Sequence, residues 1–318
     1  MSSIGGYFGL ELNQGMEEYH SGAINLNTGR NALEYILMVN SYNKLYIPFY
    51  TCGVILEPLL KLNIEYEFYS IDANLEPVFN YGNLKDNEGF LYTNYFGLKD
   101  DFILYLTGIC NNIIIDNAQS FFSRPLEGVD TFYTARKFFG VSDGAYLYSE
   151  HRIAVELDFD DSSCRLGHLI KRIEHGVKNG YSDFLKTEEE LKNEPIKQMS
   201  RLTNKILKSI DYNNVIKKRV HNFKYLMKEL NSLNELKFEL HDGFVPMVYP
   251  FLDANSSKLY SRLIGNEIFV AKYWPNVKEW VATDSFEYYL AENLLALPID
   301  HRYEIEDMAR IINLIKSV

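Results

Sequence analysis

The stretch NIIIDNAQSF, residues 112–121, decides how the fold of this chain is interpreted. It begins with a short β-branched apolar run, and the acidic residue Asp116 follows that run directly. A short apolar run bounded by polar residues is typical of a buried strand. We therefore expect Asp116 to lie at the carboxyl edge of a sheet.

Similar short runs lie on both sides of this stretch. Helical or longer connections separate them, and their ranges are 45–49, 65–70, 89–94, 131–134 and 145–149. This alternation predicts an α/β fold with a mostly parallel sheet covered by helices. In such sheets a ligand binds at the carboxyl ends of the strands, so the residues that follow each strand are the candidates for chemistry.

The C-terminal third of the chain has a different pattern. Residues 199–233 are rich in Lys, Asn and Leu and lack Gly and Pro, which predicts a long helix bridging two domains. A smaller α+β domain follows, with apolar runs at 246–252 and 267–274, a helix near 256–264 and a last helix after 300. We expect a large domain at 1–225 and a small domain at 226–318.

Composition excludes several classes of function. The 318 residues carry a net charge of -11, so a nucleic acid partner is not expected. No apolar run reaches the ~20 residues that cross a bilayer. The three cysteines Cys52, Cys110 and Cys164 have no metal-ligand spacing, so no metal site is expected. With no export signal at the start, reduced thiols and a cytoplasmic location are predicted.

The segment NTGRNALEYIL, residues 27–37, is the first candidate for ligand binding. A turn at Gly29 opens a predicted amphipathic helix, which leaves the backbone N–H groups of Arg30 and Asn31 free at its start. Free amides and the helix dipole together form a phosphate site. The alternative is an ordinary helix start capped by Asn27 or Thr28.

Asp116 and Gln119 form the second candidate. A carboxylate at a sheet edge, partly buried, needs a cationic partner or several donors, and a protonated pyridine nitrogen is one such partner. Gln119 lies three residues further and can face the same ligand. The alternative is that Asp116 caps the next helix.

Lys137, in the segment TFYTARKFFGVSDGAYLY at 131–148, is the third candidate. Its aromatic neighbours in sequence are Phe132, Phe138 and Phe139. An amine partly desolvated among such rings is favoured in its neutral form, which suits Schiff-base chemistry. Thr134 and Arg136 are near enough in sequence to hold a phosphate. The alternative is a surface lysine whose stem covers apolar side chains.

A phosphate site, an acid for a ring nitrogen and a lysine, in this order on an α/β sheet, are what a pyridoxal 5'-phosphate (PLP) enzyme needs. Over most of its length the chain resembles the DegT/DnrJ/EryC1/StrS family, the sugar aminotransferases of PLP fold type I. The matching segments are NTGRNAL (27–33), IPFYTCGVILEPL (47–59), TNYFG (93–97), IIIDNAQSF (113–121), ARKFFGVSDGAYL (135–147), the helix from 200 to 226 and LPIDHRY (297–303).

The resemblance implies the aspartate-aminotransferase-like fold, with a large domain and a smaller C-terminal α+β domain. It implies that Lys137 forms the Schiff base with the cofactor and moves protons at the substrate carbon. Asp116 would hold the pyridinium proton, and Gln119 would lie near the phenolic oxygen. The phosphate would be bound at the Gly29 turn by the amides of Arg30 and Asn31 and by Thr134.

The implied reaction moves an amino group from an amino acid donor, typically glutamate, to a keto sugar linked to a nucleotide. The family context is the biosynthesis of surface polysaccharides or related compounds. Members of the family are usually homodimers with sites built across the interface, so a homodimer is implied.

The chain departs from the family pattern at several positions. Cys52 stands where the family commonly has an aromatic ring that stacks on the cofactor, and Tyr50 is the candidate to replace it. Phe132 stands in place of a serine five residues before the lysine. The region between Lys137 and the bridging helix, which often reaches the sugar nucleotide, is shorter than is typical.

Two alternatives remain. One is a PLP enzyme with a different reaction or keto substrate; its dehydratase branch has a histidine at the lysine position, so Lys137 opposes that branch. The other is a non-catalytic or regulatory relative. Cys52 and the shortened region favour this second alternative, whereas the retention of Asp116, Gln119 and Lys137 opposes it.

Overall fold

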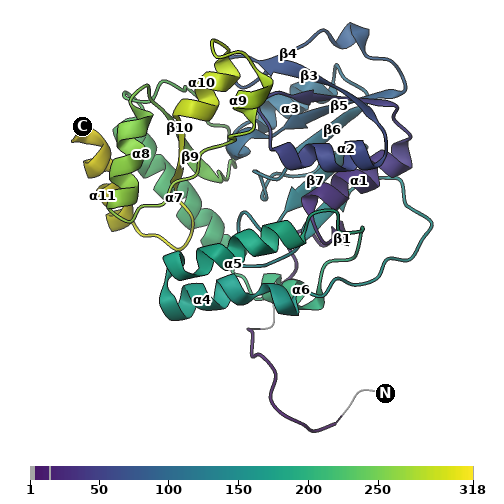
Figure 1. Cartoon of the computed structure of the whole chain (residues 1–318), viewed down its shortest axis with the longest axis horizontal. Coiled ribbons are helices and arrows are strands. Elements are labelled where there is room, and N and C mark those ends of the chain that lie inside the picture. Colours follow the sequence, from purple (N-terminus) through teal and green to yellow (C-terminus); the bar gives the residue numbers. More distant parts are fainter. Residues whose placement is uncertain (1–3, 14–15, 318) are drawn as a thin grey trace.

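The computed structural model describes residues 4–13 and 16–317, which fold around an eight-stranded sheet (Figure 1). The strand order is β1-β8-β7-β6-β5-β2-β3-β4. The strands are β1 (Ile24–Leu26), β2 (Lys44–Pro48), β3 (Glu65–Ile71), β4 (Pro77–Val78), β5 (Glu88–Thr93), β6 (Ile113–Asn117), β7 (Asp130–Thr134) and β8 (Ala145–Tyr148). From β3 through β2, β5 and β6 to β7 all pairings are parallel, whereas β8, β1 and β4 add in antiparallel. The predicted mostly parallel α/β sheet is therefore confirmed.

Both faces of this sheet are covered, because side chains alternate between two hydrophobic clusters along each strand. On β6, Ile114 belongs to the cluster that contains Leu33 and Ile36 of helix α1 (Gly29–Asn40). Its neighbour Ile115 belongs to the opposite cluster, together with Tyr92 of β5. This double burial explains why the strands are nearly continuous apolar or aromatic runs. It also leaves the strand ends as the places where polar side chains gather.

The predicted long helix at 199–233 is wrong in one respect, because it is two helices. These are α6 (Arg201–Leu207) and α7 (Tyr212–Leu230). Asp211 caps the second one, and its side chain accepts a hydrogen bond from the N–H of Asn214 at 3.0 Å. An Asp at this position offers a helix start within a stretch whose composition is otherwise helical throughout. The predicted boundary at 225 and 226 falls inside α7, so the division into two domains stays a prediction.

The C-terminal part contains a second, two-stranded sheet of β9 (Val248–Leu252) and β10 (Leu294–Pro298), paired antiparallel. Its helices are α8 (Ser256–Gly265), α9 (Val277–Trp280), α10 (Phe286–Asn293) and α11 (Ile305–Lys316). The apolar run at 267–274 forms one isolated bridge, between Ala271 and Ala296, instead of a strand. Figure 1 shows this part beside the large sheet, with α7 leading into it.

Four more α-helices belong to the large-sheet part: α2 (Leu56–Lys61), α3 (Asp100–Thr107), and α4 (Gly167–His175) and α5 (Val177–Glu190), which form a helical hairpin. The hairpin lies between the lysine turn and α6. A Cβ atom at Gly180 would lie 2.7 Å from the backbone oxygen of His168, so glycine is what lets the two helices approach. The hairpin brings the end of α5 towards the edge of the sheet.

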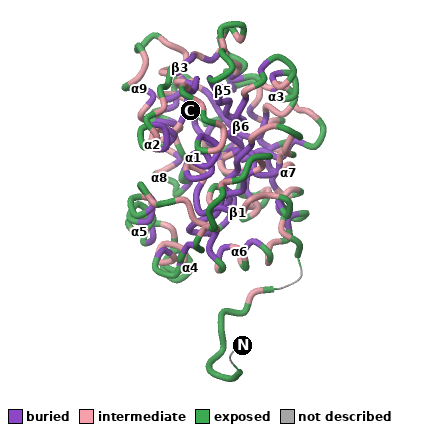
Figure 2. Tube along the Cα trace, turned by 90° about the vertical axis from the view of Figure 1, so that its right-hand side faces the viewer, coloured by how far each residue is buried: buried purple, intermediate pink, exposed green. Residues whose placement is uncertain are grey.

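The first described residues leave the body of the protein as an extended segment (Figure 2). Ile4, Tyr7 and Phe8 are almost fully exposed there. In the described ranges, no helix combines the length and the apolar composition needed to cross a membrane.

Candidate active site

A pocket lies at the carboxyl edge of the large sheet, where β2, β5, β6 and β7 end and α1 begins. This is the edge at which open α/β sheets bind ligands. Most of the predicted site residues line it: Gly29, Arg30, Cys52, Asp116, Gln119, Thr134 and Lys137. The structure thus brings together segments that are more than a hundred residues apart in the sequence.

Asp116 is the most buried charged group of the pocket. It ends the apolar run of β6, and it pairs in register with Thr93 of β5 and Phe132 of β7. Its Oδ1 accepts a hydrogen bond from the N–H of Ala118 at 2.8 Å. Burial raises the pKa of the carboxyl, and the Lys137 charge and the Ala118 N–H oppose this shift. The carboxylate therefore lies where a further cationic donor would stabilise it.

Gln119 presents an unused donor to the same pocket. Its Oε1 accepts a hydrogen bond from the backbone N–H of Phe96 at 2.9 Å, which fixes the orientation of the amide. Its Nε2 is buried and has no partner among the residues that the structure describes. A buried amide donor without a partner costs free energy, so this atom is suited to a ligand oxygen.

Lys137 lies in the turn after β7 and reaches the pocket, but the expected partial desolvation is wrong. Its side chain is exposed. The rings of Phe138 and Phe139 pack into the core instead, against Phe121, with centroid distances of 5.7 and 4.9 Å. Aromatic neighbours in sequence therefore do not surround the amine, because the turn directs them to the core.

The phosphate site predicted at the start of α1 is present in part. Thr28 caps the helix, and its Oγ1 accepts a hydrogen bond from the N–H of Asn31 at 3.2 Å, so the expectation of a free amide at Asn31 is wrong. The Asn31 side chain is buried and donates to the backbone oxygen of Glu194 at 2.9 Å. In the described part of the chain, the N–H groups of Gly29 and Arg30 have no such partner.

Thr134 faces this helix start from the end of β7. A Cβ atom at Gly29 would lie 3.9 Å from both the Thr134 Cβ and the Phe132 ring. The Thr134 hydroxyl makes only a long contact of 3.4 Å with the backbone oxygen of Gly144. Two free amides and a weakly engaged hydroxyl thus converge at one end of the pocket, an arrangement that suits an anion.

Two arginines line the pocket, and each is paired with a glutamate. Arg30 Nη1 lies 2.8 and 2.7 Å from the two carboxylate oxygens of Glu57 on α2. Arg136 forms an ion pair with Glu188 near the end of α5, and both side chains line the pocket. Arg136 was expected to lie near enough to hold a phosphate; its guanidinium is bound by Glu188 in this structure, and the phosphate role stays a prediction.

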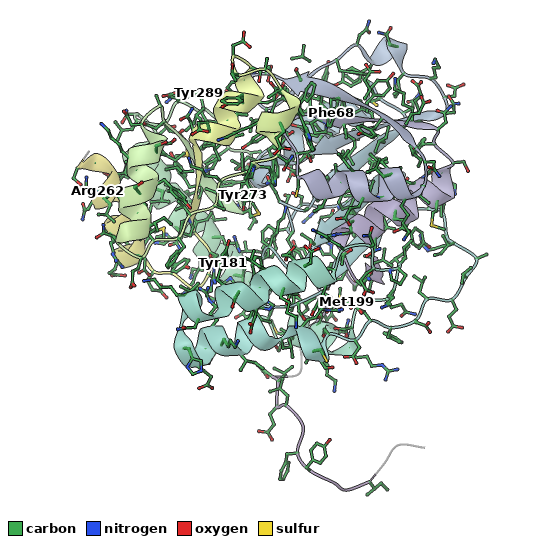
Figure 3. The ribbon with its side chains drawn as sticks, in the orientation of Figure 1. Phe68, Tyr181, Met199, Arg262, Tyr273 and Tyr289 are labelled. Carbon is green, nitrogen blue, oxygen red and sulfur yellow. The ribbon has the colours of Figure 1, made fainter. Side chains whose placement is uncertain are left out.

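Tyr50 does not line the pocket, so the expectation that it replaces the missing aromatic ring is wrong. Its side chain is completely buried, and its hydroxyl donates to the backbone oxygen of Tyr273 at 2.7 Å. Figure 3 labels Tyr273. Trp274, which packs on Tyr50, lines the pocket together with Cys52. Sequence reasoning missed it because it lies far along the chain, in a run that resembles a strand.

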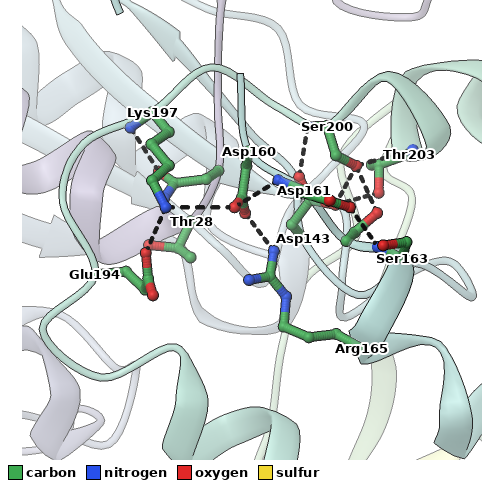
Figure 4. A network of polar contacts seen from close by, with 12 residues as sticks. Thr28, Asp143, Asp160, Asp161, Ser163, Arg165, Glu194, Lys197, Ser200 and Thr203 are labelled. Atoms are coloured by element: carbon green, nitrogen blue, oxygen red, sulfur yellow. Dashed lines mark hydrogen bonds and ion pairs between the residues drawn. The ribbon is translucent and has the colours of Figure 1, made fainter. Parts of the chain in front are cut away.

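The turn that follows Lys137 is joined to the start of α6 by hydrogen bonds. The buried carboxylate of Asp143 accepts hydrogen bonds from the N–H and the hydroxyl of Ser200, both at 2.7 Å, and from the hydroxyl of Thr203 (Figure 4). The next residue, Gly144, donates its N–H to the backbone oxygen of Asn27 at 2.6 Å. The lysine turn and the residues before α1 are therefore joined directly.

Solved structures of similar fold exist, although no family model and no curated protein matches the sequence. A DegT DnrJ EryC1 StrS aminotransferase from Brucella abortus superimposes with a TM-score of 0.60 at 15% identity, covering 93% of this chain and 85% of that chain. The sugar aminotransferase CalS13 from Micromonospora echinospora gives a TM-score of 0.62 at 14% identity, covering 93% of this chain and 87% of that chain.

A third structure is the GDP-4-keto-6-deoxy-D-mannose-3-dehydratase of E. coli with bound hydrated PLP. Its TM-score is 0.62 at 13% identity, and 92% of this chain and 87% of that chain are covered. The fold is PLP fold type I. An aminotransferase and a dehydratase share this fold. The fold alone therefore does not identify the reaction, which has to be inferred from the residues that line the pocket.

These residues fit PLP. The buried carboxylate of Asp116 matches a protonated ring nitrogen, and the partnerless Nε2 of Gln119 matches a ring oxygen. The free amides at Gly29 and Arg30 match a phosphate. The described residues contain no group of His, Cys, Asp and Glu side chains that could hold a metal ion.

Proposed function

We propose that this chain is a PLP-dependent aminotransferase of the DegT/DnrJ/EryC1/StrS type. The observation that carries the proposal is that Asp116, Gln119 and Lys137 line one pocket of a PLP fold type I protein. A buried carboxylate, a buried amide donor without a partner and an accessible amine serve no common structural purpose there. Together they match the polar groups of one ring-shaped cofactor.

Each residue has a role that follows from its contacts. PLP supplies an electron sink for the substrate carbon when it is bound. Lys137 carries the cofactor covalently through its accessible amine and moves a proton at the reacting carbon. Asp116 would hold the protonated ring nitrogen, and its second carboxylate oxygen, which does not accept from Ala118, is available for this. A cation at this place offsets the burial of the carboxylate, so both groups are stabilised in their charged forms.

The phosphate end follows from the helix start. The amides of Gly29 and Arg30 donate to the phosphate, and the Thr134 hydroxyl adds a third donor. Asn31 contributes indirectly, since its side chain ties the start of α1 to Glu194. Phe132, which replaces the serine of the family pattern, packs beside Gly29 and contributes no hydrogen bond.

The proposed substrates are an amino acid donor, with glutamate the first choice, and a nucleotide-linked keto sugar. Support comes from the solved structures of similar fold, which include sugar aminotransferases. The proposal includes the pathway class of surface-polysaccharide or related biosynthesis, a cytoplasmic location and a homodimer. Sedimentation of the purified protein tests the homodimer, and a monomer at all concentrations would contradict it.

The decisive experiment is an absorbance spectrum of the purified protein with added PLP, before and after borohydride, followed by peptide mass mapping. A visible band that reduction fixes onto Lys137 supports the cofactor. Lys137→Ala should abolish the band, and its survival would contradict the role of the lysine. No band and no adduct would favour a non-catalytic relative with a ligand-binding cleft.

A second experiment separates an aminotransferase from other PLP enzymes of this fold. An aminotransferase converts glutamate to 2-oxoglutarate in the absence of any sugar, in an amount that matches the PLP bound. A dehydratase or an enzyme with another donor leaves glutamate unchanged. After a positive result, nucleotide-linked keto sugars are tested as acceptors with glutamate as the donor.

A further inference from the structure

Trp274 occupies a place in the pocket that the sequence pattern leaves without an aromatic ring. Trp274 is 7% exposed and lines the pocket together with Cys52. The two residues are more than two hundred positions apart in the chain, and Trp274 precedes α9 in the C-terminal part. The pocket therefore has an aromatic wall that comes from outside the large sheet.

The backbone on both sides of Trp274 is fixed to the segment after β2. On one side, the Tyr50 hydroxyl donates to the backbone oxygen of Tyr273 at 2.7 Å. On the other side, Asn276 Nδ2 donates to the backbone oxygen of Thr51 at 3.0 Å, and its Oδ1 accepts from the N–H of Gly53 at 3.2 Å. These contacts bracket Trp274 and hold it beside the segment that contains Cys52.

The ring of Trp274 is fixed as well. Tyr50 packs against it edge-on, with a centroid distance of 5.0 Å and an interplanar angle of 62°. Tyr50 is thus a support for the tryptophan, which explains why its own ring is buried and its hydroxyl is engaged. An indole held in this way presents a preorganised π-face, and such faces attract flat aromatic rings and cations.

We propose that Trp274 covers the ring of the bound cofactor, in place of an aromatic side chain at position 52. The inference rests on the proposed function, since a flat, positively charged ring is the group that such a wall recognises. Phe132 also lines the pocket, but it lies beside Gly29 and Thr134 at the phosphate end. Trp274 lines the same pocket, and the contacts of its neighbours Tyr273 and Asn276 hold it beside the segment that contains Cys52.

The experiment uses the fact that the chain has only two tryptophans, Trp274 and Trp280. Trp280 is the matched control, because it packs on Phe68 of β3 at a centroid distance of 4.8 Å and does not line the pocket. PLP is titrated into the wild-type protein, Trp280→Phe and Trp274→Phe while tryptophan emission is followed. The fraction of emission quenched at saturation should be clearly larger in Trp280→Phe than in Trp274→Phe. Equal fractions in the two variants would overturn the inference.

The affinity for PLP gives a second readout. Trp274→Phe keeps an aromatic ring and should bind PLP nearly as well as the wild type. Trp274→Leu should bind it about 2- to 10-fold more weakly, as expected for the loss of one aromatic contact. If Trp274→Leu does not fold, the comparison of emission quenching between Trp280→Phe and Trp274→Phe still tests the inference. An unchanged affinity in a folded Trp274→Leu protein would count against the inference.

Borohydride trapping on Lys137, followed by mass mapping in the same samples, separates this inference from the proposed function. Trapping in all variants with equal quenching would remove Trp274 from the cofactor site and leave the proposed function intact. Absence of trapping and of quenching in the wild-type protein would contradict both.

Discussion

A carboxylate buried at a strand end costs folding free energy unless a ligand compensates it, and Asp116 carries this cost. Because burial raises its pKa, the folded state binds the proton more readily than the unfolded state. Its contribution to stability therefore falls as the pH rises above the unfolded pKa of about 3.9. The cofactor-free protein is therefore destabilised at neutral pH by the residue that the proposed function requires.

Asp116→Asn should therefore stabilise the cofactor-free protein at pH 7, by about 1–3 kcal/mol, because it removes a buried charge. The gain should shrink as the pH approaches 4. The same variant should retain PLP but lose about 100-fold or more in rate, since the ring nitrogen loses its charged partner. Urea unfolding at several pH values checks the first part, with Asp86→Asn in an exposed loop as the control. A variant less stable than the wild type at pH 7 would contradict this explanation.

Glu188 binds the guanidinium of Arg136, and both side chains line the pocket. Glu188→Gln should release the guanidinium and remove a negative charge, so the anionic cofactor should bind about 2- to 5-fold more tightly. PLP titration followed by absorbance measures this. Glu189→Gln is the matched control, because Glu189 pairs with Lys192 on the exposed side of the hairpin. Equal effects of both substitutions would show that only the overall charge matters.

Among single residues, the most informative sequence signal for the pocket was that a polar residue directly follows a predicted strand. It placed Asp116 and Lys137 correctly in the pocket, because β6 and β7 are buried strands whose ends are marked by polar residues. It could not reveal Trp274 or Glu188, which reach the pocket from distant helices and loops. The capping of the Asn31 amide by Thr28 was equally hard to foresee, since the same sequence pattern fits a cap or a phosphate site.

At the level of elements, the turn between β7 and β8 has the strictest geometric requirement. Gly144 has a φ of +115°, and a Cβ atom there would lie 2.9 Å from the Thr203 methyl group of α6. Gly144→Ala should therefore destabilise the protein by about 2 kcal/mol or more, through backbone strain and the steric clash together. Thermal unfolding measures the loss.

Two further variants separate these causes. Gly140→Ala lies in the same loop without positive φ, with its nearest neighbour 3.8 Å away, and should be almost neutral. Thr203→Ser combined with Gly144→Ala removes the methyl group and keeps the hydroxyl that donates to Asp143. This pair should recover part of the loss. No recovery would mean that strain at Gly144 accounts for the whole effect.

The elements themselves were largely predictable, for a physical reason. The strands of the large sheet are buried on both faces, so their apolar runs are uninterrupted and end sharply. The stretch 199–233 was harder, because its composition favours a helix at every position and only the cap at Asp211 marks the break. The short strand β1 (Ile24–Leu26) was not predicted, since three residues carry too little periodicity.

On the scale of the whole molecule, acid should unfold this protein partly through His20. The imidazole is buried, with one nitrogen 2.8 Å from the backbone oxygen of Phe121, and burial lowers its pKa to about 4. Between about pH 6.5 and 4 the unfolded state therefore binds more protons than the folded state. This group alone should cost about 3 kcal/mol of stability as the pH falls through that window.

His20→Gln should flatten the dependence of stability on pH in this range, as measured by urea midpoints at pH 7, 6 and 5. Burial also lowers the pKa values of His168 and His301, so the slope should decrease without vanishing. The control is His151→Gln, at an exposed histidine. Its dependence of stability on pH should equal that of the wild type. An unaltered slope in His20→Gln would mean that other groups govern acid unfolding.

The position of Trp274 late in the sequence has a consequence for chains that are not yet complete. Strands that reach the pocket are made early, with β7 complete at residue 134, but Trp274 and the Asn276 contacts to residues 51 and 53 come from the last part of the chain. A nascent or prematurely ended chain can therefore build most of the sheet and still lack a closed cleft. A chain that ends before residue 274 should therefore bind PLP more weakly than the full-length chain, as expected for Trp274→Leu.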